Sequence, residues 1–324
     1  MAESPRDQAG NPLALLSVHA HPDDEASKGA GTVARYSDEG VHCVLVCCTG
    51  GEAGDILNPA VDTPEVRERL HEVRMEELQA SADAIGYDVV DLLGYHDSGM
   101  PDTETNARPD NFANAALDEA VERLVRIVRA ERPQVIITYD EDRKFYPHPD
   151  HIRVHEISVP AFEAAGDPDR YQDAGEPWQP SKLYYTGWSR RRVKALHDAH
   201  IRLGQESPYT TWFERGLPET ETHFTTFVDV GEYLHRRRAA LLAHRTQVDP
   251  EGFWMRLPDP ELRKVFPWEE FVLARSLVDT GLDESEPEDD LFTGLRAEVP
   301  SPRSTSGASP SGGGGGFAAV ADKE

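Results

Sequence analysis

The sequence has few cysteines, few basic residues and no long apolar run, and each shortage excludes a class of protein. Its 324 residues include three cysteines, Cys43, Cys47 and Cys48, which crowd one predicted strand. An odd number of cysteines without spaced pairs argues against a disulfide framework and suits a reducing cytoplasm. We expect all three to be small apolar core residues.

Basic residues are outnumbered by acidic ones, 33 to 59, which gives a formal net charge of −26. Such a chain is a poor candidate for non-specific binding to nucleic acid or to an anionic membrane. No apolar run approaches the roughly 20 residues needed to span a bilayer. The first ten residues have neither the charged nor the apolar region of a signal peptide. We therefore expect a soluble cytoplasmic protein with no nucleic-acid or membrane partner; its oligomeric state is left open.

Strand-like and helix-like segments alternate over the first 188 residues. The expected strands cover residues 13–19, 41–48, 88–93, 135–139 and 181–186, and the expected helices between them cover 29–40, 64–86, 113–131 and 151–165. Alternation of this kind is typical of a mostly parallel sheet with helices on both faces. The predicted fold class is therefore α/β and Rossmann-like, with this core over residues 1–188.

The rest of the chain follows a different pattern. Helical patterns near 189–204, 232–247 and 268–278 are separated by irregular, Pro-rich stretches. They predict a smaller, mainly helical C-terminal portion of the same domain, residues 189–296, that covers the site. Six of the eight residues from Asp283 to Asp290 are acidic, which predicts a solvated run. Residues 297–324 are low in complexity and are expected to be a disordered tail.

Histidines and carboxylates are concentrated directly after the first predicted strand. The apolar run Leu13–Val18 is followed by His19-Ala20-His21-Pro22-Asp23-Asp24-Glu25. Two imidazoles and three carboxylates therefore lie where a parallel strand ends, the edge at which open α/β sheets place their sites. The segment indicates a metal site with an adjacent acid or base, and its alternative interpretation is a solvated acidic loop.

A second cluster, Tyr146-Pro147-His148-Pro149-Asp150-His151, follows another strand-like run, Val135–Tyr139, across a short polar loop. Parallel strands of one sheet deliver both clusters to the same edge. Catalytic zinc is usually held by three protein ligands of the His and Asp or Glu type, with one position open. One strand end offers His21 and Asp24 and the other offers His148 and His151. The pair of clusters favours a metal site over a solvated loop.

These motifs resemble the LmbE/PIG-L family of zinc-dependent amide hydrolases, which act on N-acyl glucosamine derivatives. The resemblance begins with the two clusters and covers roughly residues 13–294. Its further motifs are Ser27-Lys28-Gly29, Thr49-Gly50-Gly51-Glu52, Ile56-Leu57-Asn58-Pro59, Asp97-Ser98-Gly99, Asp173-Ala174-Gly175-Glu176-Pro177-Trp178 and Ala243-His244-Arg245-Thr246-Gln247.

The resemblance implies one zinc ion per chain held by His21, Asp24 and His151, although Fe²⁺ tolerates the same ligand types. It also implies that Asp23 acts as the general base toward the attacking water. A second carboxylate ligand to the same ion is the competing role for Asp23. On spacing alone His155, one turn beyond His151, is a rival ligand, and we expect it to be a structural residue instead.

Two further residues are expected to act on the developing negative charge of the scissile amide. A protonated His148 could stabilise the oxyanion and donate the proton of the leaving amine, and Tyr146 could add a phenolic hydrogen bond. The chain departs from the family pattern just before this tyrosine. It has Glu141-Asp142-Arg143-Lys144-Phe145 where a short Gly-rich loop is usual, which puts the placement of Tyr146 in question.

The resemblance places Arg74 and Asp97 against the hydroxyls of the sugar and polyol, and Lys28 against the amide carbonyls of a cysteinyl arm. The alternatives are a surface salt bridge for Arg74 and a solvent-facing side chain for Lys28. The implied reaction is hydrolysis of the cysteinyl–glucosamine amide in mycothiol S-conjugates, small molecules of thiol-dependent detoxification. The alternatives are deacetylation of N-acetylglucosaminyl-inositol in mycothiol synthesis, or a repurposed protein that handles thiol conjugates in a biosynthetic pathway.

Overall fold

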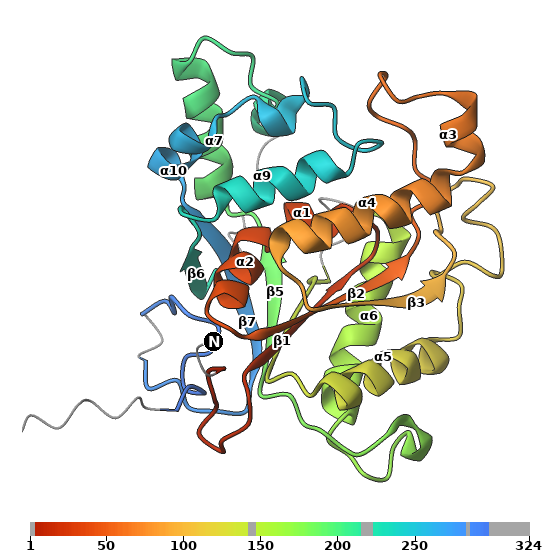
Figure 1. Ribbon diagram of the computed structural model, residues 1–324, viewed down its shortest axis with the longest axis vertical. Helices are drawn as coiled ribbons and strands as arrows, with labels where there is room; N and C mark the ends of the chain where they lie inside the picture. The colour runs from red at the N-terminus through yellow and green to blue at the C-terminus, as the bar shows by residue number, and fades with distance from the viewer. Residues whose placement is uncertain (1–3, 142–146, 215–222, 283–285, 298–324) are drawn as a thin grey trace, which may run out of the picture.

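A seven-stranded sheet organises the computed structural model, which describes residues 4–141, 147–214, 223–282 and 286–297 (Figure 1). The strand order is β3-β2-β1-β4-β5-β7-β6. All five strands expected from the sequence are present and mutually parallel. They are β1 (Ala14–His19), β2 (His42–Thr49), β3 (Val89–Tyr95), β4 (Val135–Thr138) and β5 (Lys182–Gly187). The predicted α/β, Rossmann-like class is confirmed.

Helices cover both faces of the sheet, so its central strands are buried on both sides (Figure 1). One face is packed by α2 (Ala30–Asp38), α4 (Leu70–Ile85) and α9 (Leu234–Ala243), and the other by α5 (Leu117–Glu131) and α6 (Pro149–Ala164). Two short helices, α1 (Asp24–Ser27) and α3 (Pro64–Glu68), lie in the loops after β1 and β2. Burial in two separate apolar clusters explains why these strands are nearly continuous apolar runs.

The expected helix at 268–278 is wrong, because Trp268–Ser276 is strand β7. It runs antiparallel to β5 on one side and to β6 (Thr226–Asp229) on the other. Its two glutamates are buried and accept hydrogen bonds from backbone N–H groups at helix starts. Glu269 accepts from Gly31 and Thr32 of α2, and Glu270 accepts from Ser189. Pairing with the open edge of β5 therefore outweighs the helical composition of the segment.

The C-terminal part thus extends the sheet and also adds helices. Besides α9, it contains α7 (Arg190–Arg202), α8 (Thr210–Glu214) and α10 (Asp259–Val265). In Figure 1, α7 and α10 lie together beside α9. No helix among the described residues is long and apolar enough to cross a membrane. The predicted tail lies almost wholly outside the described residues, which end at 297.

The expectation of a solvated acidic run is wrong for Glu288, which is 5% exposed. Its carboxylate accepts hydrogen bonds from Nζ of Lys182 at 2.5 Å and from the hydroxyl of Thr226 at 2.9 Å. Tyr184 on β5 donates to the same carboxylate. A lysine that points into the core from β5 needs a counter-charge, because an unpaired buried charge is strongly destabilising. Asp283 and its two successors lie outside the described residues.

Candidate active site

The segments after β1 and β4 bring His21, Asp24 and His151 together in a buried group. One oxygen of Asp24, Oδ2, lies 3.2 Å from Nε2 of His151 and 3.5 Å from Nδ1 of His21. None of the three residues is more than 9% exposed. Two imidazole nitrogens and a carboxylate oxygen that lie within 4.8 Å of one another could hold a metal ion.

The second ring nitrogen of His21 faces another carboxylate. Nε2 of His21 lies 3.2 Å from Oδ2 of Asp150, which is completely buried. The backbone N–H of Ser98 donates to Asp150 over 2.9 Å, and the Ser98 hydroxyl donates to its other oxygen. A histidine that ligates a metal usually donates its other N–H to a carboxylate, which fixes its tautomer and orientation. The sequence interpretation missed Asp150 in this role, although Asp150 lies inside the motif that holds His148 and His151.

A second group of possible ligands shares His21 and adds Asp97, His148 and Asp150. Several acceptor atoms of this group already take hydrogen bonds from the backbone. Asp97 accepts from the backbone N–H groups of Gly99 and Ala53, at 2.8 and 3.2 Å. Nδ1 of His148 accepts from the backbone N–H of Asp150 at 3.2 Å. Asp24 also accepts hydrogen bonds, from the backbone N–H of His21 at 3.0 Å and from Lys28, so the two groups are alternative candidates that share His21.

Burial and neighbouring charged groups shift the pKa values of His21, Asp24 and His151. Burial acts to lower the pKa of His21, yet hydrogen bonds with Asp150 and Asp24 raise it to about 10. Burial lowers the pKa of His151 to about 4, which leaves the neutral imidazole that a metal requires. Burial acts to raise the pKa of Asp24, but His151 and Lys28 hold it well below its usual range. A divalent cation would replace the proton of His21 and compensate the surrounding carboxylates.

Asp23 lies beside this group in an unusual backbone conformation. Its φ of 109° falls in the left-handed region, which non-glycine residues rarely adopt and which tends to occur at functional sites. The Asp23 N–H donates to Glu25 over 2.9 Å, and Nη2 of Arg74 lies 3.1 Å from the Asp23 carboxylate. Withdrawal from bulk water raises the pKa of Asp23, against the opposing charge of Arg74. The strained turn therefore directs Asp23 and Asp24 to different partners.

Arg74 is buried, at 3% exposure, and is not the exposed partner of a surface salt bridge. Its guanidinium donates to the backbone carbonyls of Gly51 and Pro22 as well as to Asp23. Asp97 is buried too and orders the loop after β3 through the bonds to Ala53 and Gly99. In this structure both residues contact protein groups. Their contacts with a substrate stay predictions.

His148 is the residue before the first turn of α6, where its ring accepts the hydrogen bond from Asp150 described above. Its ring packs edge-on against His21, with centroids 4.5 Å apart. Burial and the neighbouring His21 lower the pKa of His148. Tyr146 and residues 142–145 of the departing loop lie outside the described residues. Roles for His148 and Tyr146 at the oxyanion stay predictions.

Tyr139, at the end of β4, packs against a proposed metal ligand and was not singled out from the sequence. Its ring stacks on His151, with centroids 4.7 Å apart, and its hydroxyl lies 3.0 Å from Nδ1 of His19. Nδ1 of His155 lies 3.0 Å from the Tyr139 carbonyl oxygen, so His155 faces the end of β4 rather than Asp24. Tyr139 therefore links His19 to His151.

The cavity beside these residues has a volume of about 510 Å³. Asp23, Asp24, Lys28 and His151 lie on its wall. Nζ of Lys28 binds the Asp24 oxygen that faces away from the histidines and lies 5.6 Å from the centre of the Tyr139 ring. Most of the remaining wall is apolar or aromatic and comes largely from β5 and the C-terminal part: Leu57, Ile152, Tyr185, Trp188, Tyr209, Trp212, Phe224, Leu241, Val248, Phe253, Trp254 and Val272.

His244, from the motif Ala243–Gln247, is completely buried. Its Nε2 lies 2.6 Å from Glu25, and Ser81 donates to the same carboxylate. Gln247 lies on the cavity wall and donates to the backbone carbonyl of Asp55 over 3.0 Å. The pair of His244 and Glu25 therefore holds α9 against the loop that carries Asp23 and Asp24.

Sequence comparisons match residues 16–162 to a family model and most of the chain to known proteins. Residues 16–162 match the model of the PIG-L family, described as GlcNAc-PI de-N-acetylase. A mycothiol S-conjugate amidase of Streptomyces coelicolor is 46% identical over 88% of this chain and 98% of its own length. A 1D-myo-inositol 2-acetamido-2-deoxy-alpha-D-glucopyranoside deacetylase of Frankia casuarinae is 40% identical over 87% of this chain and 94% of its own length.

Solved structures share the fold at low sequence identity. An N,N'-diacetylchitobiose deacetylase of Pyrococcus horikoshii aligns with a TM-score of 0.55 and 20% identity, covering 80% of this chain and 83% of its own. The relatives and the fold together define the protein as an enzyme that hydrolyses amide bonds. It belongs to the PIG-L family.

The contact between Asp150 and His21 gives a first prediction. Asp150→Asn keeps the shape of the side chain but removes the charge that orients and polarises His21. We expect the affinity for the metal to fall by about 10–100-fold, the usual effect of changing a carboxylate behind a ligating histidine. Competition with a chelator measures this affinity. An unchanged affinity would show that Asp150 has only a packing role.

Proposed function

We propose that the protein is a zinc-dependent amidase that cleaves the cysteinyl–glucosamine amide of mycothiol S-conjugates. The observation that carries this proposal is the 510 Å³ cavity, whose wall combines Asp23, Lys28 and His151 with many aromatic and aliphatic side chains. An acetyl group needs far less apolar space than the substituent of a thiol conjugate. The products would be an N-acetylcysteine S-conjugate and glucosaminyl-inositol.

We further propose that residues 189–296 form the substrate-side cover of the Rossmann-like core. Support comes from the cavity wall, to which this part contributes Tyr209, Trp212, Phe253 and Trp254. The buried, unpaired cysteines of β2 are compatible with action in the cytoplasm. Detoxification would then consist of releasing the modified cysteine from its sugar carrier.

The chemistry divides among a few residues. His21, Asp24 and His151 would hold the zinc ion, which supplies a Lewis acid that polarises the amide carbonyl and lowers the pKa of water. Asp23 would take the proton of the attacking water, and its raised pKa brings it closer to the pH at which it must accept and release that proton.

Arg74 holds the Asp23 carboxylate in place. Lys28 pairs with Asp24 and lines the cavity, so its ammonium group can donate to a carbonyl of the cysteinyl arm.

A comparison of two substrates tests the proposal. We expect the bimane conjugate of mycothiol to be cleaved far faster than N-acetylglucosaminyl-inositol. The preference is the ratio of kcat/KM for the conjugate to kcat/KM for N-acetylglucosaminyl-inositol. Lys28→Ser should lower this ratio by about tenfold, the effect of losing one interaction of roughly 1.4 kcal/mol. Because Lys28 also binds Asp24, the substitution can change metal affinity, but the ratio cancels any loss that is common to both substrates. Lys194→Ser, at an exposed position on α7, is the control. Equal or reversed rates in the unmodified enzyme would assign it to deacetylation instead.

A further inference from the structure

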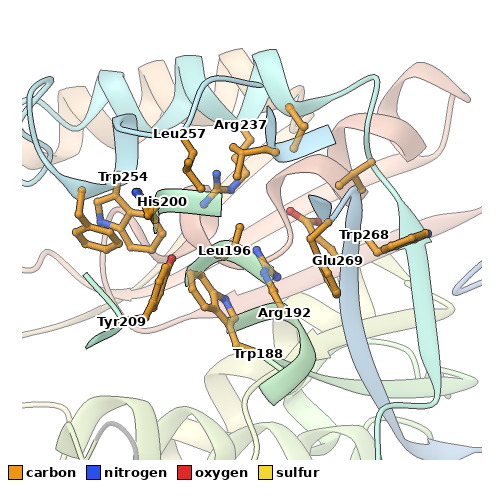
Figure 2. A pocket seen from close by; sticks show the side chains of 15 residues that line it. Trp188, Arg192, Leu196, His200, Tyr209, Arg237, Trp254, Leu257, Trp268 and Glu269 are labelled. Atoms are coloured by element: carbon orange, nitrogen blue, oxygen red, sulfur yellow. The ribbon is translucent and has the colours of Figure 1, made fainter. Parts of the chain in front are cut away.

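A second, smaller cavity lies behind the aromatic wall and contains two buried arginines. Arg192 comes from α7 and Arg237 from α9, and their guanidinium groups point into the same space (Figure 2). The cavity has a volume of about 40 Å³. We refer to it as the two-arginine cavity. Trp188, Tyr209, Phe253 and Trp254 line both this cavity and the large one beside His151.

Neither guanidinium has an acceptor among the described residues. Arg192 and Arg237 are each 9% exposed, and no carboxylate of the described chain lies within 4.0 Å of either. Nε of Arg237 is completely buried without a hydrogen-bond partner. Their close contacts are with ring faces: Arg192 lies 4.4 Å from the centre of Trp188, and Arg237 lies 5.6 Å from that of Trp254.

Among the described residues, Arg129 is another buried arginine, and it has the hydrogen-bond acceptors that Arg192 and Arg237 lack. Arg129 is 4% exposed, and its guanidinium donates hydrogen bonds to six backbone carbonyls, those of Ala164, Ala165, Asp167, Arg170, Tyr171 and Gly175. Burial of an ionised group without such partners is costly. The pair in the two-arginine cavity therefore lacks acceptors that the rest of the fold supplies to a comparable group.

Electrostatics in the cavity favour a negative guest. Burial and the charge of Arg192 lower the pKa of Arg237 to about 10. Among the described residues of the wall, Glu269 is the one acidic side chain. Its two oxygens already accept from the backbone N–H groups of Gly31 and Thr32, at 3.1 and 2.8 Å. Two positive charges thus face a single carboxylate that is committed elsewhere.

We infer that the two-arginine cavity binds a compact oxyanion, a phosphate or a carboxylate. Guanidinium groups bind both in the same way, through forked, charge-assisted hydrogen bonds. A volume of 40 Å³ admits a few water molecules or one such anionic group and excludes a larger ligand. The oxyanion can be a free ion, or it can be the charged end of a substituent that reaches in from the large cavity through the shared aromatic residues.

Inorganic phosphate is the probe for the site itself. Phosphate should raise the Tm of the metal-loaded enzyme and change its tryptophan fluorescence with one saturable curve, because Trp188 and Trp254 contact the arginines. Arg237→Gln and, independently, Arg192→Gln should each weaken this binding by about tenfold or more. Arg202→Gln, at an exposed position on α7, should leave it unchanged. The affinity measured by fluorescence should also be unchanged after a chelator removes the metal, which excludes binding at the metal itself. No saturable response, or binding in both glutamine variants that is as strong as in the unmodified enzyme, would contradict an oxyanion site in this cavity.

A pair of thiol conjugates distinguishes the two sources, and this arm rests on the proposed amidase activity. One conjugate ends in a carboxylate, and the other ends in the corresponding carboxamide. If the substrate carries the oxyanion, the carboxylate conjugate has the higher kcat/KM, and Arg237→Gln removes the advantage while the carboxamide is cleaved as before. Equal values for both conjugates, with phosphate binding intact, assign the site to a free anion. Failure of both conjugates to react contradicts the amidase proposal and leaves the phosphate measurement as the test of the site.

Discussion

His151→Ala is expected to lose the bound metal and to abolish amide hydrolysis while the protein remains folded. The reason is that His151 would supply one of the three proposed ligands, and its Nε2 lies 3.2 Å from Oδ2 of Asp24. Three protein ligands with one open position are the normal set of a catalytic zinc site, so a set of two is too weak to retain the ion at low concentration. Elemental analysis after dialysis gives the metal content, and turnover of the preferred conjugate gives the activity.

His155→Ala is the matched control, since His155 lies one turn further along α6 and was the rival ligand on spacing alone. Its ring contacts the Tyr139 carbonyl and the Tyr185 ring rather than Asp24. We expect full metal content in this variant and a modest loss of activity at most. Retention of the metal by His151→Ala, or its loss from His155→Ala, would overturn the assignment of ligands.

Much of the fold could be predicted because the first five strands form local apolar runs that end in polar loops. Each run is long enough to be buried on both faces, and the helices between the runs leave few other topologies. The two histidine clusters were informative for the same reason. One follows its strand directly and the other follows across a short polar loop, so the parallel sheet alone brings His21 and His151 to one edge.

The errors occurred where a distant partner decides the conformation. Trp268–Ser276 consists largely of residues that suit a helix, and it is a strand because β5 offers an unpaired edge. Glu288 belongs to an acidic run in the sequence, and it is buried because Lys182 needs a counter-charge. The local sequence around each segment shows neither the unpaired edge of β5 nor the buried charge of Lys182.

Within the site, the residues that were missed contact the proposed metal ligands from behind. Asp150 faces His21 from 129 positions away, and Tyr139 stacks on His151. Aspartate is common in loops and tyrosine is common in strands, so the residue types alone do not indicate these contacts. The bonds of Arg74 to the Gly51 and Pro22 carbonyls likewise depend on how α4 crosses the strand ends.

Asp23→Asn is expected to separate the base from the ligands, because the metal should stay while hydrolysis slows by about 10²-fold or more, the typical contribution of a general base. Asparagine suits this test better than alanine. It tolerates the positive φ of 109° at this position, and its amide oxygen can still accept from Arg74, so the turn and its neighbour Asp24 should keep their places.

The metal content and the two kinetic constants together decide the role of Asp23. A group that acts only on the proton in the transition state lowers kcat and kcat/KM equally, so KM should be unchanged. Asp23→Glu, with the same chemistry on a longer side chain, should recover part of kcat. If instead the metal is lost together with activity, Asp23 is a fourth ligand, and the pairing of its carboxylate with Arg74 is a feature of the metal-free state. If metal and activity both persist, the base is a different group on the cavity wall.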